Sequence, residues 1–285
     1  ALLCREVRLK TAAKDPIARQ LLDMQATLNF PMLMTASVKV IHLARKLGAK
    51  KVLFSSRDGD KWMKLFQKIA PFAGFDCETE YFYTSRLARR FPSNDYLQYA
   101  RERLTEGSLL IDLCGTGWSL AHLVNSVGLG RYPVFYVSRE KVFDGYEKSA
   151  PMPDVCDFHS IITPDNPPLS SPALELINQV PYGSAVDVKL IDGAVFPVLD
   201  VDRRPAALID FIRSQNAIFD ALIEATGREM VQGLMALNED GVASVCDALA
   251  RHICAQPLLT TLFFPSHLEE DRTVYDRLGC PDVLK

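Results

Sequence analysis

Residues 109–120 read LLIDLCGTGWSL: an apolar run ends in an acid, then come two glycines, two hydroxyls and a second apolar run. This order predicts a buried strand, a tight turn and the start of a helix. The N–H groups of such a turn point outward, and the dipole at a helix N-terminus favours negative charge. Asp112 would end the strand, where it can meet a sugar hydroxyl or a metal-bound ligand. The stretch therefore predicts a site for a phosphorylated sugar or nucleotide.

Two other predicted strands also end in polar residues. Residues 51–56 (KVLFSS) predict a short buried strand, and RDGD at 57–60 then opens a helix that Pro71 stops. Residues 79–85 predict the next strand, which leads into Arg86. Because ligands of parallel sheets bind beyond the carboxyl ends of the strands, three polar ends indicate one shared site.

The elements that must position these residues alternate along the chain. Strands are predicted at 51–56, 79–85, 108–113 and 132–138, with helices within 15–47, from 58, at 93–104 and after 117. This alternation predicts an α/β fold with a parallel doubly wound sheet. We expect residues 1–150 to form the core. Residues 151–285 would add a proline-rich extended connection at 151–182, a hairpin around Asp192-Gly193 and a mainly helical C-terminal portion that covers the site.

Composition narrows the class of protein. The chain has 285 residues, 48% of them hydrophobic, and a net charge of -3, which argues against affinity based on nucleic-acid phosphates. It contains no apolar run long enough to span a bilayer and no secretory signal. Its seven cysteines include no C-x-x-C pair, which favours reduced cysteines in a cytoplasmic protein. Because the sequence starts at Ala1, we expect it to be one module of a longer polypeptide.

The glycine-rich loop resembles that of phosphoribosyltransferases, in which a strand ending in acids precedes a loop of the form D-T-G-x-T or A-G-x-S. Asp112 matches the second acid and Gly115 the first loop residue, while Ile111 and Gly115 replace two of the family's acids. The resemblance implies a type I phosphoribosyltransferase sheet. It also implies that the loop holds the 5-phosphate of phosphoribosyl pyrophosphate and that Asp112 faces the ribose hydroxyls. The upstream SSRDGD resembles the family's pyrophosphate loop, with Arg57 on the pyrophosphate and Arg86 near the leaving group.

A closer likeness covers most of the chain. RDG, Y-x-S-R, D-x-x-G-x-G, LEL at 174–176 and GS at 183–184 resemble a group of bacterial phosphoribosyltransferase-like modules. These modules are fused to haloacid-dehalogenase-type phosphatases in surface-polysaccharide loci. The resemblance implies transfer of 5-phosphoribose from phosphoribosyl pyrophosphate onto a glycan hydroxyl, with release of pyrophosphate. A fused or partner phosphatase would then leave ribofuranose. The acceptor would be a carbohydrate, including a lipid-linked one, which is compatible with a cytoplasmic protein at the inner face of the membrane.

Chemical roles follow for the individual residues. Displacing pyrophosphate needs positive charge on the leaving group, which Arg57, Arg86 and Mg²⁺ would supply. The substrate would carry the Mg²⁺, and no protein side chain would bind the metal directly. Asp58 is the expected base for the incoming hydroxyl, although Asp58 or Asp60 is equally suited to cap the following helix. Glu175 would contact the acceptor. The predicted substrate-binding residues are Ser56, Arg57, Asp58, Gly59, Arg86, Asp112, Cys114, Gly115, Thr116, Gly117, Trp118 and Ser119.

Other interpretations of the same residues stay open. D-L-C-G-T-G also resembles the first motif of S-adenosylmethionine-dependent methyltransferases, with Glu140 as the acid that would bind ribose. D-L-C-G-T resembles the motif of haloacid dehalogenase phosphatases, but Cys114 replaces their general acid. A non-catalytic sugar-phosphate-binding module would keep the fold without the chemistry. Trp118 would either stack on a sugar or pack internally, and Arg89 and Arg90 would form either a basic rim or a solvated helix end.

Overall fold

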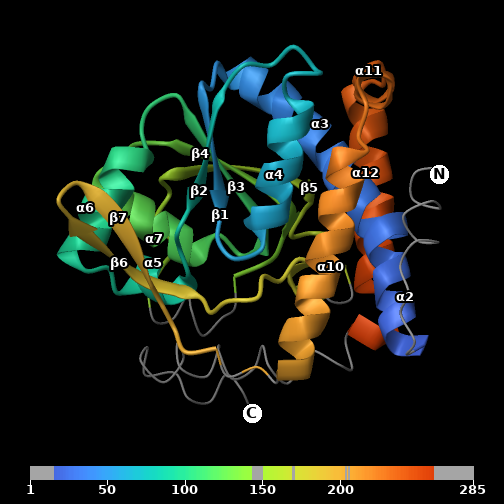
Figure 1. Ribbon diagram of the computed structural model, residues 1–285. Helices are drawn as coiled ribbons and strands as arrows, with labels where there is room; N and C mark the ends of the chain where they lie inside the picture. Colours follow the sequence, from blue (N-terminus) through green and yellow to red (C-terminus); the bar gives the residue numbers. More distant parts are fainter. Residues whose placement is uncertain (1–15, 143–149, 169–170, 203, 205, 260–285) are drawn as a thin grey trace.

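A five-stranded parallel sheet forms the centre of the protein in the computed structural model, which describes residues 16–142, 150–168, 171–202, 204 and 206–259 (Figure 1). The strand order is β2-β1-β3-β4-β5, so the chain crosses from one side of β1 to the other after β2. The α/β class expected from the sequence is confirmed, with a parallel sheet compatible with double winding. The strands are β1 (Lys51–Ser55), β2 (Glu78–Phe82), β3 (Ser108–Gly115), β4 (Tyr132–Arg139) and β5 (Cys156–Ile162).

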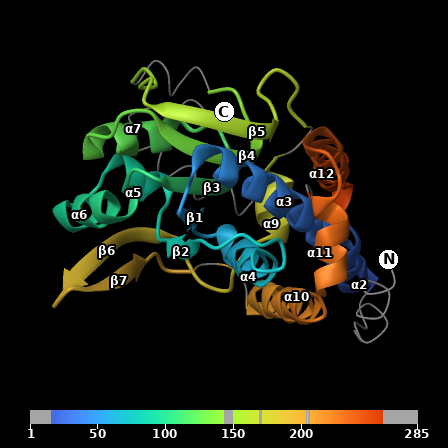
Figure 2. The same ribbon diagram turned by 90° about the horizontal axis from the view of Figure 1, so that it is seen from above.

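Helices cover both faces of this sheet (Figure 2). One face carries α3 (Phe30–Leu47), α4 (Gly59–Ile69) and α9 (Pro172–Ile177), and the other carries α5 (Arg86–Arg90), α6 (Asn94–Arg103) and α7 (Trp118–Val127). The N-terminal helix α2 (Pro16–Met24) leads into α3 through a π-helical turn, η1 (Gln25–Asn29). The C-terminal helices α10 (Ala206–Glu224), α11 (Arg228–Met235) and α12 (Glu239–Cys254) join the first of these layers.

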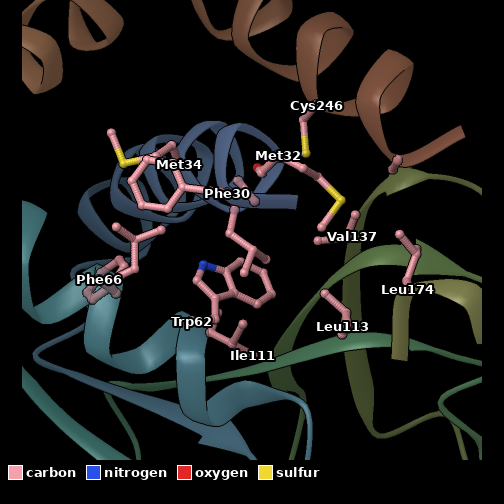
Figure 3. Packing of buried hydrophobic residues seen from close by; sticks show 14 of the residues in the cluster. Phe30, Met32, Met34, Trp62, Phe66, Ile111, Leu113, Val137, Leu174 and Cys246 are labelled. Atoms are coloured by element: carbon pink, nitrogen blue, oxygen red, sulfur yellow. Dashed lines mark hydrogen bonds between the residues drawn. The ribbon is translucent and has the colours of Figure 1, made fainter. Parts of the chain in front are cut away.

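The apolar strands bury side chains on both faces. In β1, Val52 and Phe54 belong to the cluster under α3 and α4, whereas Leu53 belongs to the cluster under α5, α6 and α7. Alternation of this kind explains why the strand reads as a continuous apolar run. Figure 3 shows the first cluster, in which Trp62 of α4 lies between α3 and β3. The Trp62 indole N–H donates a hydrogen bond to Ser37 Oγ at 2.9 Å, which satisfies its polar atom inside the core.

Several local predictions are confirmed. The hairpin consists of β6 (Ala185–Ile191) and β7 (Ala194–Leu199), and its turn places Asp192 and Gly193 at φ 50° and 78°. Two consecutive positive φ values are typical of the tight turns that match strand twist. Ser93 caps α6 by accepting from the Tyr96 N–H, and α10, α11 and α12 provide the helical segments expected after residue 205.

The extended connection predicted for 151–182 is wrong. This segment contributes β5, which pairs with β4 and extends the sheet, and α9, which packs beneath β3. The expected division at residue 150 therefore falls inside the sheet. The sequence of β5 mixes polar and apolar residues, so its pairing with β4 defines the strand better than any apolar run does. The short helix α5 was likewise not expected, and Ser85 caps it by accepting from the Ala88 N–H.

Two further observations concern the whole of the described chain. No helix within it combines the length and apolar character needed to cross a bilayer. The structure describes five cysteines, of which Cys114, Cys156, Cys246 and Cys254 are buried and Cys77 is partly exposed. The apolar stretch that starts at Leu258 lies mostly outside the described residues.

Candidate functional site

The two predicted loops meet at the carboxyl edge of neighbouring strands. β1 lies between β2 and β3, and Phe54 of β1 pairs in parallel register with Ile111 of β3. The chain leaves β1 and β3 toward opposite sides of the sheet, which makes this edge the topological switch point where α/β proteins bind ligands. Arg57 follows β1 and Thr116 follows β3, so both extend from the same edge as the sequence predicts.

Asp112 forms a buried ion pair with an arginine that the sequence did not assign to it. Arg89 Nη2 donates to Asp112 Oδ2 at 3.0 Å, with side-chain exposures of 10% and 13%. Arg89 also donates to Ser55 Oγ at 3.2 Å and to Thr84 Oγ1 at 2.9 Å, which joins the ends of β1, β2 and β3. The expectation of a solvated helix end is therefore wrong for Arg89: the residue is a structural part of the site.

The charge of Asp112 is set by opposing effects. Burial raises the pKa of this carboxyl above its ordinary value, while the Arg89 guanidinium acts against the rise and Glu175 adds to it. The Leu113 N–H also donates to Asp112 Oδ1 at 3.0 Å. Because one oxygen is held by Arg89, Asp112 is better placed to accept hydrogen bonds than to remove a proton.

Glu175 brings a second carboxylate to the end of β3. The Cys114 thiol donates to Glu175 Oε1 at 3.1 Å and lies 3.5 Å from the Ser171 carbonyl oxygen. Burial, with Glu175 next in importance, raises the pKa of Cys114 well above its ordinary value, so the thiol stays protonated. Glu175 and Asp112 thus stand near each other, although Ile111 replaces the acid expected within the strand itself.

The loop after β1 is tied to the end of β2. Ser56 Oγ donates to the Thr84 carbonyl at 2.6 Å and accepts from the Thr84 N–H at 2.8 Å. The Ser56–Arg57 peptide bond is cis. The Tyr81 hydroxyl donates to the Arg57 carbonyl at 3.2 Å, and only 9% of Arg57 is exposed.

Later segments of the chain approach this loop as well. The Tyr182 hydroxyl donates to Tyr81 Oη at 3.1 Å. The pKa of Asp202 is lowered, chiefly by its hydrogen bond from Arg204, and the positive charge of Arg57 contributes to the shift. The Arg57 segment is therefore held by Tyr81 through its backbone carbonyl, and its charge acts on Asp202. Arg86, the other predicted leaving-group contact, begins α5 and is partly exposed.

Asp58 occupies the N-cap position of α4 but does not act as a cap. Its backbone lies at φ −79° and ψ −15°, and its side chain makes no capping hydrogen bond. Asp60 lies in the first turn and pairs with Lys64 at 2.9 Å, so neither acid fulfils the capping prediction. Gly59 packs closely against β1, because a Cβ there would lie 3.2 Å from Phe54 Cβ and 3.3 Å from its carbonyl carbon.

The loop after β3 uses glycine where backbone geometry demands it. Gly115 and Gly117 have φ values of 143° and 80°, and a Cβ on Gly117 would lie 2.6 Å from the Phe158 ring. Thr116 Oγ1 accepts from the Trp118 N–H at 3.2 Å, and Ser119 is buried in the first turn of α7. A turn of this shape directs backbone donors toward an anion.

Trp118 packs internally and is not an exposed platform for a sugar. It is 1% exposed, its indole N–H donates to the Ala150 carbonyl at 2.8 Å, and its ring lies 4.8 Å from that of His122. The Arg90 guanidinium stacks on this ring at 4.3 Å. The solvated helix end expected for Arg90 is therefore also wrong.

Within the described residues, no three carboxylate, imidazole or thiolate side chains converge as a metal cage. A divalent cation carried on a ligand diphosphate does not need such a cage. No protein-family model and no curated protein matches this chain.

Proposed function

We propose that the protein is a phosphoribosyltransferase that moves 5-phosphoribose from phosphoribosyl pyrophosphate to a carbohydrate hydroxyl. The observation that carries the proposal is the position of two loops at one switch point, each of a kind that suits an anion: the Arg57 loop after β1 and the Thr116 loop after β3. An activated sugar with a phosphate at each end matches two such loops separated by a carboxylate, Asp112. A ligand with a single anionic group would need only one of them.

Each group of the site has a task in this reaction. Arg57 and Arg86 would hold the diphosphate and stabilise the charge that develops on it as the bond to C1 breaks. Asp112 would accept hydrogen bonds from the ribose hydroxyls, since Arg89 fixes its orientation. Backbone groups at 116–119 would hold the 5-phosphate. Mg²⁺ bound to the diphosphate would add positive charge to the leaving group.

Asp58 is the proposed base. It stands next to the diphosphate loop, it is not used to cap α4, and Asp112 is already engaged by Arg89. The proton of the acceptor hydroxyl would pass to the Asp58 carboxylate as the oxygen bonds to C1. Pyrophosphate would leave with the electron pair of the broken C1–O bond. Glu175, held by the Cys114 thiol, would contact the acceptor or the ribose from the opposite side.

A ligand screen separates this function from the alternatives. Phosphoribosyl pyrophosphate with Mg²⁺ should raise the melting temperature, and S-adenosylmethionine should not. Arg57→Gln should remove the effect, while Arg131→Gln, a change at an exposed arginine paired with Asp154, should retain it. Stabilisation by S-adenosylmethionine alone would refute the proposal. Binding of phosphoribosyl pyrophosphate without turnover on any glycan acceptor would favour a sugar-phosphate-binding module.

A further inference from the structure

Two arginines beside the Thr116 loop have no acidic partner in the part of the chain that the structure describes. The Arg90 guanidinium lies over the Trp118 ring at 4.3 Å, and the Arg139 guanidinium lies over the Phe158 ring at 4.0 Å. Among the described residues neither side chain forms a hydrogen bond or an ion pair, and the Nε atom of each is shielded from solvent without a partner. Arg89 lies on the same short helix as Arg90, but its guanidinium forms an ion pair with Asp112.

The two stacking rings place both guanidiniums around one loop. Trp118 is the first residue of α7, and the Phe158 ring occupies the space that a Cβ of Gly117 would take. Arg139 pairs in register with Gly115, and the N–H of the next residue donates to the Gly115 carbonyl at 3.1 Å. The arginines therefore flank residues 115–118 from α5 and from β4.

Stacking determines which part of each guanidinium is available. A ring contact uses the flat face of the group and leaves its N–H edge for an acceptor. Burial lowers the pKa of both arginines, with no carboxylate acting against the shift, but they remain cationic at neutral pH. A partly buried charge without a counter-ion costs free energy in the folded protein. An anionic ligand that neutralises these two positive charges would offset that cost.

The first turn of α7 adds donors of the same polarity. The N–H groups of Ser119 and Leu120 have no acceptor within their own helix, because the first turn of a helix lacks preceding carbonyls. Two guanidiniums and these N–H groups match a phosphate monoester, which carries close to two negative charges and three acceptor oxygens at neutral pH. A carboxylate would neutralise only one of the arginines.

We propose that Arg90 and Arg139 clamp the terminal phosphate monoester of a sugar phosphate at the loop 115–119, and thereby select phosphorylated over unphosphorylated pentoses. Only the identity of the sugar rests on the proposed function. The clamp itself follows from the two stacked, unneutralised guanidiniums.

Calorimetric titration with two separate probes tests the clamp. Ribose 5-phosphate carries only the monoester, and inorganic pyrophosphate with Mg²⁺ stands in for the leaving group. Arg139→Gln and Arg90→Gln should each weaken ribose 5-phosphate about 10- to 100-fold, as expected for the loss of a charge-assisted hydrogen bond, and change pyrophosphate binding less than about twofold. Arg57→Gln should show the opposite pattern, and Arg131→Gln should change neither.

The outcomes distinguish this inference from the proposed function. If Arg139→Gln leaves ribose 5-phosphate binding unchanged while Arg57→Gln weakens pyrophosphate, the clamp is refuted and the transferase is not. If pyrophosphate and phosphoribosyl pyrophosphate do not bind but Arg139→Gln abolishes ribose 5-phosphate binding, the clamp stands without the transferase. The unmodified protein supplies a test that does not depend on the folding of a variant. If it binds ribose as tightly as ribose 5-phosphate, the clamp is refuted.

Discussion

Replacing Lys61 with methionine should stabilise the protein near neutral pH. Lys61 is fully buried in the first turn of α4, and its Nζ donates to the Ile177 carbonyl at 3.2 Å. Burial lowers its pKa to about 7, because the loss of hydration outweighs the attraction of Asp60 and the more distant acids. The Ile177 carbonyl also accepts from Gln25 Nε2 at 2.6 Å, so the variant does not leave that carbonyl without a donor.

The size and sign of the effect follow from proton linkage. Between pH 7 and 10.5 the unfolded chain binds a proton at Lys61 that the folded chain does not, so the free energy of unfolding rises with pH. The slope is about 1.4 kcal/mol per pH unit, and the total is roughly 5 kcal/mol across the window. Below pH 7 the full cost of ionised Lys61 is present. The variant lacks this cost and loses one hydrogen bond, worth about 1 kcal/mol.

Urea unfolding at a series of pH values from 6.5 to 10 measures the difference. Lys61→Met should be several kcal/mol more stable than the parent at pH 6.5, and its advantage should disappear near pH 10. Lys64→Met is the matched control, because Lys64 is a half-exposed neighbour paired with Asp60. The control should keep most of the pH dependence, because Lys64 is only a minor cause of the lowered pKa of Lys61. A destabilised Lys61→Met variant at pH 6.5, or parallel pH profiles for variant and parent, would refute the reasoning.

Two further substitutions address the site. Asp112→Ala should lower the melting temperature by roughly 10 °C because it leaves Arg89 buried without a counter-ion, at a cost of about 3–5 kcal/mol; Asp112→Asn removes the same charge and should melt close to Asp112→Ala, and melting of either variant at the temperature of the parent would contradict the ion pair. Gly117→Ala should cost about 1–3 kcal/mol, since φ 80° and the Phe158 ring both exclude a Cβ, and calorimetry showing unchanged melting would count against the loop geometry.

Local patterns in the sequence determined much of the fold. Apolar runs of strand length identified β1, β3 and β4, and Gly48, with φ 65°, ends α3. The Asp192-Gly193 pair identified the hairpin, and the polar residues after β1 and β3 identified the two loops of the site. These features depend on a few neighbouring residues each, so they are readable without knowing what packs against them.

Only the tertiary structure decided which charges meet. Asp112 points to the α5 face, where Arg89 neutralises it, and α9 places Glu175 beside Cys114 across 61 positions of sequence. The residues of β5 became a strand through pairing with β4, and that pairing brings Phe158 under Gly117 and Arg139 onto Phe158. Each of these contacts joins segments that are distant along the chain, and no local propensity specifies such a partner. The two loops of the proposed site were therefore visible in the sequence, whereas the partners of Arg89, Arg90 and Arg139 beside them were not.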